Sequence, residues 1–137
     1  MFKNLLEFQK TFSTEIKCIR YLEKLRWNNK PVCFRCGEND RSSFLKKAGL
    51  YSCGRCRSQF SIRKGTIFED SALPLVKWFN AFYYEISNIK AMSSYNLADK
   101  IGVHQETAWF VQQRIRWALK NNTIEKFKGD VEVDELT

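Results

Sequence analysis

Two pairs of cysteines are the residues with the clearest chemistry in this sequence. Each pair has C-x-x-C spacing, with Cys33 and Cys36 in the first and Cys53 and Cys56 in the second. Each pair can turn two thiolates toward one point, and residues 37–52 have the length of a hairpin that brings the pairs together. Four thiolates complete a tetrahedral Zn²⁺ site with no open position, so the metal would be structural. The spacing is typical of a zinc ribbon.

A redox or disulfide role is the alternative for any single C-x-x-C motif. Two pairs at this separation, in a chain without a secretory signal, favour metal binding. The fifth cysteine, Cys18, has no partner and lies in a helix-like apolar pattern, so we expect a small buried residue there. Gly37 and Gly54 are expected to ease the tight turns of the two pairs.

The segments around the cysteines are predicted to form helices and a small sheet. Ser13 or Thr14 can cap a helix over residues 15–27. Short strands are expected at residues 43–46, 50–52 and 59–62. Pro74 suits the first turn of a second helix over residues 75–86. One face of that helix is heavily aromatic, with Trp78, Phe79, Phe82 and Tyr83.

Composition restricts the class of protein. A chain of 137 residues with 44% hydrophobic residues can bury a core, divided here into small modules. The sequence has no cleavage site near its N-terminus and no apolar run long enough to span a bilayer, so we expect a soluble protein in the reducing cytoplasm, without a membrane partner. The net charge is +8, and four thiolates with one Zn²⁺ would leave about +6. This charge suits a polyanionic partner.

The positive charge is concentrated around the second cysteine pair. Between positions 41 and 64, every charged residue is basic: Arg41, Lys46, Lys47, Arg55, Arg57, Arg63 and Lys64. The stretch can face DNA phosphates, with Lys46 and Lys47 as contacts. Alternatively, these cations balance the anionic zinc-thiolate cluster or form a solvated face.

Residues 97–111 have the register of a helix-turn-helix. Gly102 supplies the turn, and small residues at 98 and 108 let two helices approach closely. The following helix has a predicted buried stripe of Ala108, Val111, Ile115 and Leu119. Its predicted outward stripe is His104, Gln105, Trp109, Gln112, Gln113, Arg116 and Lys120, as a helix lying in the major groove requires. An ordinary helical hairpin is the alternative.

Several side chains of this helix are candidate DNA contacts. Gln105 and Gln113 have amide geometry for adenine, while Arg114 and Arg116 can reach guanine or phosphate. His104, the sole histidine, fits a helix start or a phosphate contact better than a metal ligand or a catalytic base. Two bulky neighbours, Trp109 and Phe110, either lie in the groove or are buried against the preceding aromatic helix.

In the acidic stretch of residues 128–137, valines alternate with acidic residues, and this alternation is typical of a β-strand. Glu132 and Asp134 share one face, and acids grouped on a strand can hold Mg²⁺ for phosphoryl transfer. Such a site needs further carboxylates. Read alone, this stretch is a polar edge strand or a frayed tail.

Together these segments resemble the N-terminal part of a bacterial insertion-sequence transposase of the ISXO type. The resemblance covers nearly the whole chain. It rests on residues 21–22 and 26–27, on the segment 63–69, on Leu75 and Trp78, and on 97–98, 102–103, 107–109, 114–116 and 131–135. It implies a zinc ribbon, a helix-turn-helix and a DDE RNase H-like domain that uses Mg²⁺ in the full-length enzyme. It also implies that Asp134 is the first acidic catalytic position.

The chain departs from the family pattern at Phe34, where proline is usual, at Phe110, where a basic residue is common, and at Leu136, where threonine is usual. The strands of the second and third acidic residues are missing, so we expect no DNA cleavage by this polypeptide.

We therefore predict an α+β, mostly helical fold. The expected domains are an N-terminal helical segment at 1–30, a zinc ribbon with four cysteine ligands at 31–64, a helix-turn-helix domain at 65–122, and a linker with the first RNase H-like strand at 123–137. The resemblance implies DNA transposition, with double-stranded DNA at insertion-sequence ends as partner, and a homo-oligomer or the full-length transposase as a further partner. A stand-alone regulator of transposition, or a remnant without function, is the alternative.

Overall fold

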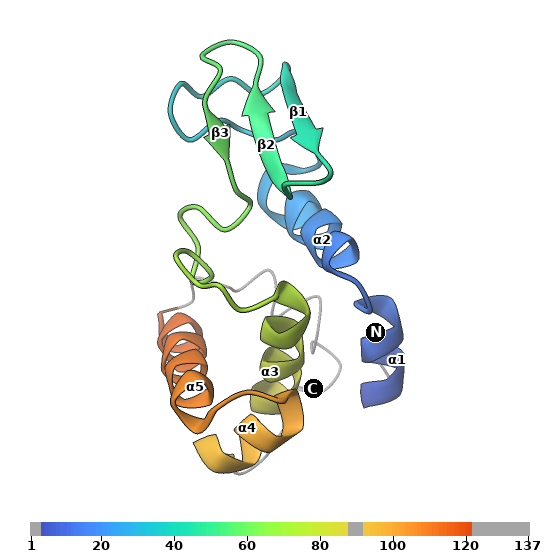
Figure 1. Cartoon of the computed structure of the whole chain (residues 1–137), viewed down its shortest axis with the longest axis vertical. Helices are drawn as coiled ribbons and strands as arrows, with labels where there is room; N and C mark the ends of the chain where they lie inside the picture. Colours follow the sequence, from blue (N-terminus) through green and yellow to red (C-terminus); the bar gives the residue numbers. More distant parts are fainter. Residues whose placement is uncertain (1–3, 88–91, 122–137) are drawn as a thin grey trace. The chain divides into compact units, whose positions relative to one another are not determined.

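The computed structural model describes residues 4–87 and 92–121, which divide into two compact units. One unit is the segment 14–72. The other joins the segment before residue 14 to the segment after residue 72. Both are drawn in Figure 1. The predicted α+β class is confirmed, since five helices and one antiparallel sheet make up the regular structure of the described residues.

The first unit consists of one helix and a three-stranded antiparallel sheet. Helix α2 spans Glu15–Trp27, and strands β1, β2 and β3 span Ser42–Leu45, Leu50–Cys53 and Gln59–Phe60. The strand order is β1-β2-β3. Phe44 lies opposite Tyr51, which lies opposite Phe60. This register gathers aromatic rings on one face of the sheet.

Aromatic packing joins α2 to this sheet. The ring of Tyr51 stacks on Phe60 at a centroid distance of 5.3 Å, and Trp27 at the end of α2 contacts both rings edge-on at 5.3 and 5.8 Å. The buried carboxylate of Glu23 on α2 accepts a hydrogen bond from the Tyr51 hydroxyl and pairs with Arg20 at 3.0 Å. Burial, followed by this carboxylate, raises the pKa of Tyr51. The first unit therefore has a small core of its own.

Two arginines connect α2 to the loop that follows the sheet, through a hydrogen bond and an ion pair. Arg26 donates a hydrogen bond to the carbonyl of Ile62 at 2.7 Å. Arg63 donates to the carbonyl of Ser71 at 2.9 Å and pairs with Glu15 at 3.3 Å. The side chain of Arg63 is 19% exposed, and its burial lowers the pKa of Arg63 although the charge of Glu15 opposes this. Arg63 therefore has a structural role within this unit.

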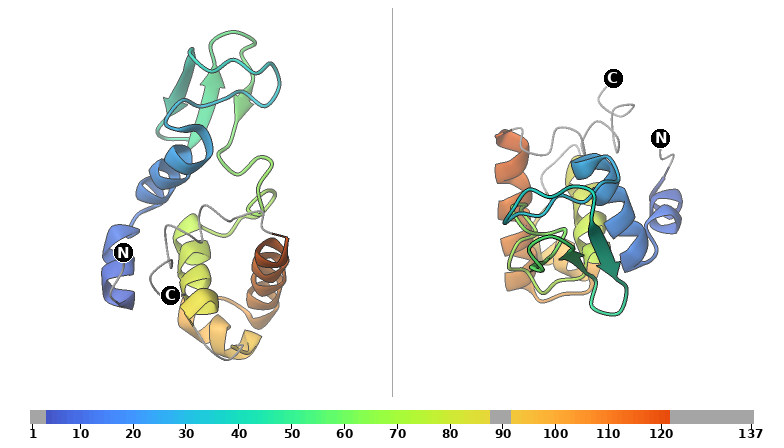
Figure 2. Two further views of the ribbon diagram at one scale, coloured as in Figure 1. Left: turned by 180° about the vertical axis from the view of Figure 1, so that it is seen from behind. Right: turned by 90° about the horizontal axis from the view of Figure 1, so that it is seen from above.

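The second unit is helical. Its helices are α1 (Leu5–Thr11), α3 (Leu75–Ser87), α4 (Ser94–Ile101) and α5 (Gln105–Lys120). Figures 1 and 2 show α3 and α5 side by side, with α4 across one end of the pair. Helix α1 packs on α3 through two aromatic pairs, Phe8 with Tyr83 and Phe12 with Phe79, each at 4.9 Å. The largest fully buried side chains of its core are Trp78, Phe8, Phe79, Phe82, Leu75, Leu97 and Ile115.

Most predicted elements are present, with shifted ends. Helix α2 has its predicted bounds and is capped by Thr14, whose hydroxyl accepts from the backbone N–H of Lys17 at 3.3 Å. Pro74 lies directly before α3, and its carbonyl accepts from Trp78 at 3.2 Å. Strand β3 ends at Phe60, two residues earlier than expected. Helix α1 was not predicted as a separate element.

The two compact units group the segments differently from the four predicted domains. Helix α2 belongs to the unit of the sheet, and α1 belongs to the unit of the later helices. The boundaries at residues 30, 64 and 122 stay predictions. In the part of the chain that the structure describes, no helix has both the length and the apolar character needed to cross a membrane.

Candidate metal centre and nucleic-acid surface

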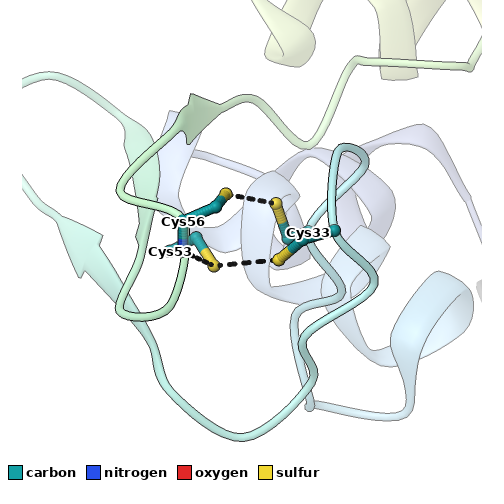
Figure 3. Close-up of side chains that lie close together, drawn as sticks. Cys33, Cys53 and Cys56 are labelled. Atoms are coloured by element: carbon teal, nitrogen blue, oxygen red, sulfur yellow. Dashed lines mark hydrogen bonds between the residues drawn. The ribbon is translucent and has the colours of Figure 1, made fainter.

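The four paired cysteines converge on one point, as their spacing predicts. Their sulfur atoms all lie within 4.8 Å of one another. Two shorter distances cross between the pairs, 3.6 Å from Cys33 to Cys56 and 3.5 Å from Cys36 to Cys53. Figure 3 shows side chains of the two turns pointing toward each other. Zn–S bonds of about 2.3 Å place tetrahedral sulfurs roughly 3.8 Å apart, so the arrangement fits a Zn²⁺ ion.

Both cysteine turns have the same backbone hydrogen bonds. In the first turn, the N–H of Gly37 donates to the carbonyl of Cys33 at 2.9 Å. In the second, the N–H of Arg57 donates to the carbonyl of Cys53 at 3.0 Å. The N–H group two residues after each leading cysteine points at its sulfur, at 3.4 Å in both turns. Such donors stabilise a thiolate and orient it toward a metal.

Hydrogen bonds shift the pKa values of the second pair of thiols. The hydroxyl and then the backbone N–H of Ser58 lower the pKa of Cys56 to about 6. The N–H of Cys56 and then that of Arg55 lower the pKa of Cys53. At Cys36 the N–H of Glu38 acts the same way, but burial and the neighbouring sulfurs outweigh it and raise the pKa to about 11. Adjacent sulfurs resist joint ionisation, and a bound cation relieves that repulsion.

One of the two glycines has the predicted turn role, and the other does not. Gly37 takes the left-handed conformation that follows the first pair, with φ of 79°. The corresponding residue of the second turn is Arg57, with φ of 64°. Gly54 instead allows a close approach, because a Cβ there would lie 2.4 Å from the carbonyl oxygen of Arg41, which accepts the Gly54 N–H at 2.8 Å. The turn prediction for Gly54 is therefore corrected to a packing role.

We expect Arg57→Gly to stabilise the first unit. A non-glycine residue in the left-handed region costs about 1–2 kcal/mol, and the extra freedom of glycine in the unfolded chain offsets part of this, so the gain should be about 0.5–1 kcal/mol. Urea unfolding of the zinc-loaded chain would measure it. The matched control is Arg55→Gly, because Arg55 is not among the residues with positive φ. The control should lose stability, and a gain in both variants would contradict the explanation.

The basic stretch around the second pair is partly occupied by internal ion pairs. Arg41 lies 3.5 Å from Glu38, Arg63 pairs with Glu15, and Lys64 lies 3.0 Å from Glu69. By contrast, Lys46 and Lys47 are exposed in the turn between β1 and β2, and no ion pair joins either to a carboxylate of the described residues. These two lysines keep the phosphate-contact role predicted for them as a hypothesis.

A short turn joins α4 to α5. Gly102 has φ of 70° and donates to the carbonyl of Ala98 at 2.9 Å. Lys77 of α3 donates to the carbonyl of Gly102 at 2.9 Å. His104 occupies the N-cap of α5 without a side-chain capping bond and is exposed. The buried side of α5 consists of Ala108, Val111, Gln112, Ile115 and Ala118.

This arrangement changes the predicted outward stripe of α5. Gln112 is 2% exposed and donates to the carbonyl of Met92 at 2.8 Å, so its predicted outward position is wrong. Leu119 is half-buried, and Ala118 replaces it in the fully buried stripe. These residues lie near the boundary between the buried and exposed faces of α5. At this boundary, the way the neighbouring helices pack decides whether a given side chain is buried.

Three of the five candidate contacts interact with other side chains of the unit: Gln105, Arg114 and Arg116. Gln105 donates to the hydroxyl of Ser94 at 2.7 Å. Arg116 pairs with the mostly buried carboxylate of Glu85 at 3.3 Å and donates to Met92 at 3.2 Å. Burial raises the pKa of Glu85, and Arg116 opposes that shift. The Gln105 and Arg116 side chains help to position α5. Arg116 remains exposed, and so are Gln113 and His104.

The outward side of α5 carries exposed aromatic rings. Trp109, Phe110 and Trp117 are 54%, 41% and 57% exposed, so the alternative in which Trp109 and Phe110 are buried is wrong. The guanidinium of Arg114 lies over the Phe110 ring, 4.6 Å from its centroid. Trp117 was not singled out from the sequence. Its position seven residues after Phe110, on the same helical face, is the signal that could have identified it.

Asp134, predicted to be the first acidic catalytic position, lies outside the described residues, as does Glu132. Cys18 is fully buried, and its burial, followed by the charge of Glu15, raises its pKa to about 12. It is therefore a packed apolar residue, as predicted.

Comparison with known proteins gives two matches. Residues 13–59 match the family described as the transposase zinc-ribbon domain. The chain is also 33% identical over 130 residues to an uncharacterized protein in transposable element ISH50 of Halobacterium salinarum. That alignment covers 93% of this chain and 43% of the relative, so the chain spans less than half of the relative's length. No solved structure matches. These matches support a transposase-related protein with a four-cysteine zinc-ribbon segment.

Proposed function

We propose that this chain binds double-stranded DNA at the ends of an insertion-sequence element and acts in transposition. The observation that carries the proposal is the match of residues 13–59 to the transposase zinc-ribbon domain, over the segment where four cysteine sulfurs converge. A metal-braced ribbon holds its loops rigidly, and the net charge of +8 attracts a polyanion. A structural zinc, a cytoplasmic location and self-association or pairing with a longer transposase belong to the same proposal.

In this proposal two surfaces contact the DNA. The β1–β2 turn, with Lys46 and Lys47, supplies phosphate contacts, which position the protein without reading sequence. The outward side of α5 supplies the base contacts, through Gln113 and Arg114 with His104 at the helix start. Gln105 and Arg116 serve this surface chiefly by positioning α5, because their side chains already bond to Ser94 and Glu85.

Catalysis would belong to the whole protein. Two-metal phosphoryl transfer needs several carboxylates around Mg²⁺, and Asp134 is the candidate that this chain contributes.

Fluorescence anisotropy with a labelled duplex carrying the element's terminal repeat tests the proposal. We expect binding that weakens steeply with salt, and the double change Lys46→Ala with Lys47→Ala should lower the slope of log K against log salt by about 1.8, from two lost phosphate contacts. The loss should be equal for the terminal repeat and for an unrelated duplex.

The matched control removes the same charge elsewhere, with Lys10→Ala and Lys24→Ala, two exposed helical lysines. If the control lowers the slope as much as the hairpin change does, net charge and not the β1–β2 turn drives binding. A zinc-loaded chain that binds neither duplex at low salt would contradict the proposed function.

A further inference from the structure

The outward side of α5 presents two tryptophan rings that the fold leaves largely uncovered. Trp109 and Trp117 are 54% and 57% exposed. Within the described part of the chain, no other aromatic ring and no cation stacks on either indole, whereas the guanidinium of Arg114 lies over the Phe110 ring. Tryptophan is highly buried on average, and exposed apolar patches mark interaction surfaces. The two indoles are therefore candidates for contact with a ligand.

The charges around these rings indicate the class of partner. Helix α5 contains one acidic residue, Glu106, and three basic residues: Arg114, Arg116 and Lys120. Lys120 is exposed, and no ion pair joins it to a carboxylate of the residues that the structure describes. A second copy of the chain would bring the same cations against one another across a symmetric interface, at a cost in repulsion. A polyanion with flat apolar groups suits this surface better.

DNA bases offer flat faces only where they are unpaired. In an intact duplex, stacked neighbours about 3.4 Å apart along each strand cover the faces of every base, so the grooves present base edges. An indole can stack on a base that has left this arrangement, and such stacking tolerates any sequence because every base has a π-face. Trp109 and Trp117 are separated by about 12 Å along the helix axis, so each ring can take its own base.

We propose that Trp109 and Trp117 stack on unpaired bases of a DNA strand, so that the chain prefers DNA whose base pairs are locally open. This inference rests on the proposed DNA-binding function and names the form of DNA that the outward side of α5 takes. Gln113 is exposed and lies one helical turn from each ring, so its amide can bond to the edge of a stacked base. Lys120 supplies an ammonium group for a neighbouring phosphate.

Three labelled DNA probes of one length test the proposal with the zinc-loaded chain in fluorescence anisotropy. The first is a fully paired duplex of unrelated sequence, the second has a short mismatched stretch at its centre, and the third replaces the mismatched bases by abasic sites. We expect the mismatched probe to bind about 5-fold or more tighter than the paired one, the effect of stacking at least one base. The abasic probe keeps the phosphates but loses the base rings, so it should bind like the paired duplex.

Substitutions on α5 assign this preference to the two rings. Trp109→Leu and Trp117→Leu keep an apolar side chain without a π-face, so each should reduce the preference for the mismatched probe, and the double change should remove it. Trp117→Phe keeps a ring and should retain part of the preference. Tyr95→Leu is the matched control, because Tyr95 is a 71% exposed aromatic residue on α4, and it should leave the preference unchanged. Zinc content and far-UV circular dichroism should be the same for all variants, because these rings are exposed.

The outcomes separate this inference from the function on which it rests. Equal affinity of the unsubstituted chain for the paired and mismatched probes would overturn the inference and leave the proposed function intact. The inference would also be overturned if the abasic probe bound as tightly as the mismatched one, since backbone flexibility would then explain the preference, or if the double variant kept the preference. A chain that binds neither these probes nor the terminal repeat at low salt contradicts the proposed function, and the inference fails with it.

A protein interface is the competing use of these rings. If the double variant converted a dimer to a monomer in sedimentation and left the preference among the probes unchanged, the rings would serve self-association, and the inference would be rejected.

Discussion

Removal of zinc is expected to unfold the first unit of this chain. Structural Zn²⁺ in small domains contributes about 10–16 kcal/mol at neutral pH, as much as the roughly 5–15 kcal/mol that stabilises an ordinary domain. Metal analysis should find one zinc per chain, and a chelator should remove the dispersed amide signals of residues 31–60 in the NMR spectrum. This expectation rests on the convergence of the four sulfurs and on the backbone N–H groups that point at two of them.

The size of the first unit explains the dependence on metal. Its strands are four, four and two residues long, and isolated sheets of that size are marginal in water. Rings of Tyr51, Phe60 and Trp27 supply most of the contact between sheet and helix. A core this small needs a crosslink, and the metal provides one between segments far apart in sequence.

The fifth cysteine provides a matched control for this prediction. Cys53→Ser should lower the zinc content and unfold the unit, whereas Cys18→Ala should keep one zinc per chain, because Cys18 is buried in α2 away from the other sulfurs. A ribbon that stays folded in chelator, with no bound zinc, would reject the structural role of the metal.

Local features of the sequence predicted the parts of the fold that depend on short-range rules. The C-x-x-C pairs specify their own turns, so the convergence of the cysteines followed from spacing. Helix α2 was correctly bounded because Thr14 caps it and Asn28 ends it in the left-handed conformation. The aromatic face of α3 was predicted from its period, and Trp78, Phe79 and Phe82 are buried.

Features that depend on contacts distant in sequence were not predictable in the same way. The role of Gly54 follows from the approach of Arg41, which no local pattern reveals. No local pattern indicates which cations of the basic stretch pair within the unit, as Arg63 does with Glu15 on α2. On α5, the inward position of Gln112 depends on the carbonyl of Met92, and the pairing of Arg116 depends on Glu85 of α3. Tertiary partners determine which polar residues remain for a ligand.

Substitution of Trp78 by alanine is expected to cause the largest loss among core changes in the second unit. Trp78 on α3 is fully buried, and truncating a large buried aromatic to alanine costs about 3–5 kcal/mol through lost burial and a residual cavity. That loss is a large share of the roughly 5–15 kcal/mol that stabilises an ordinary domain. Urea unfolding followed by far-UV circular dichroism would measure it. The zinc content should remain one per chain, because all four ligands lie in the other unit.

The chain contains its own control for this experiment. Trp109 on α5 is the same residue type but is 54% exposed, so Trp109→Ala should change the free energy of unfolding by no more than about 0.5 kcal/mol. The same variant should affect DNA affinity if the outward side of α5 faces the groove, whereas Trp78→Ala should reduce DNA affinity only at urea concentrations or temperatures that unfold the helices. Equal destabilisation by both changes would show that Trp109 packs against a surface in solution, and the outward side of α5 would then be excluded as a DNA-reading surface.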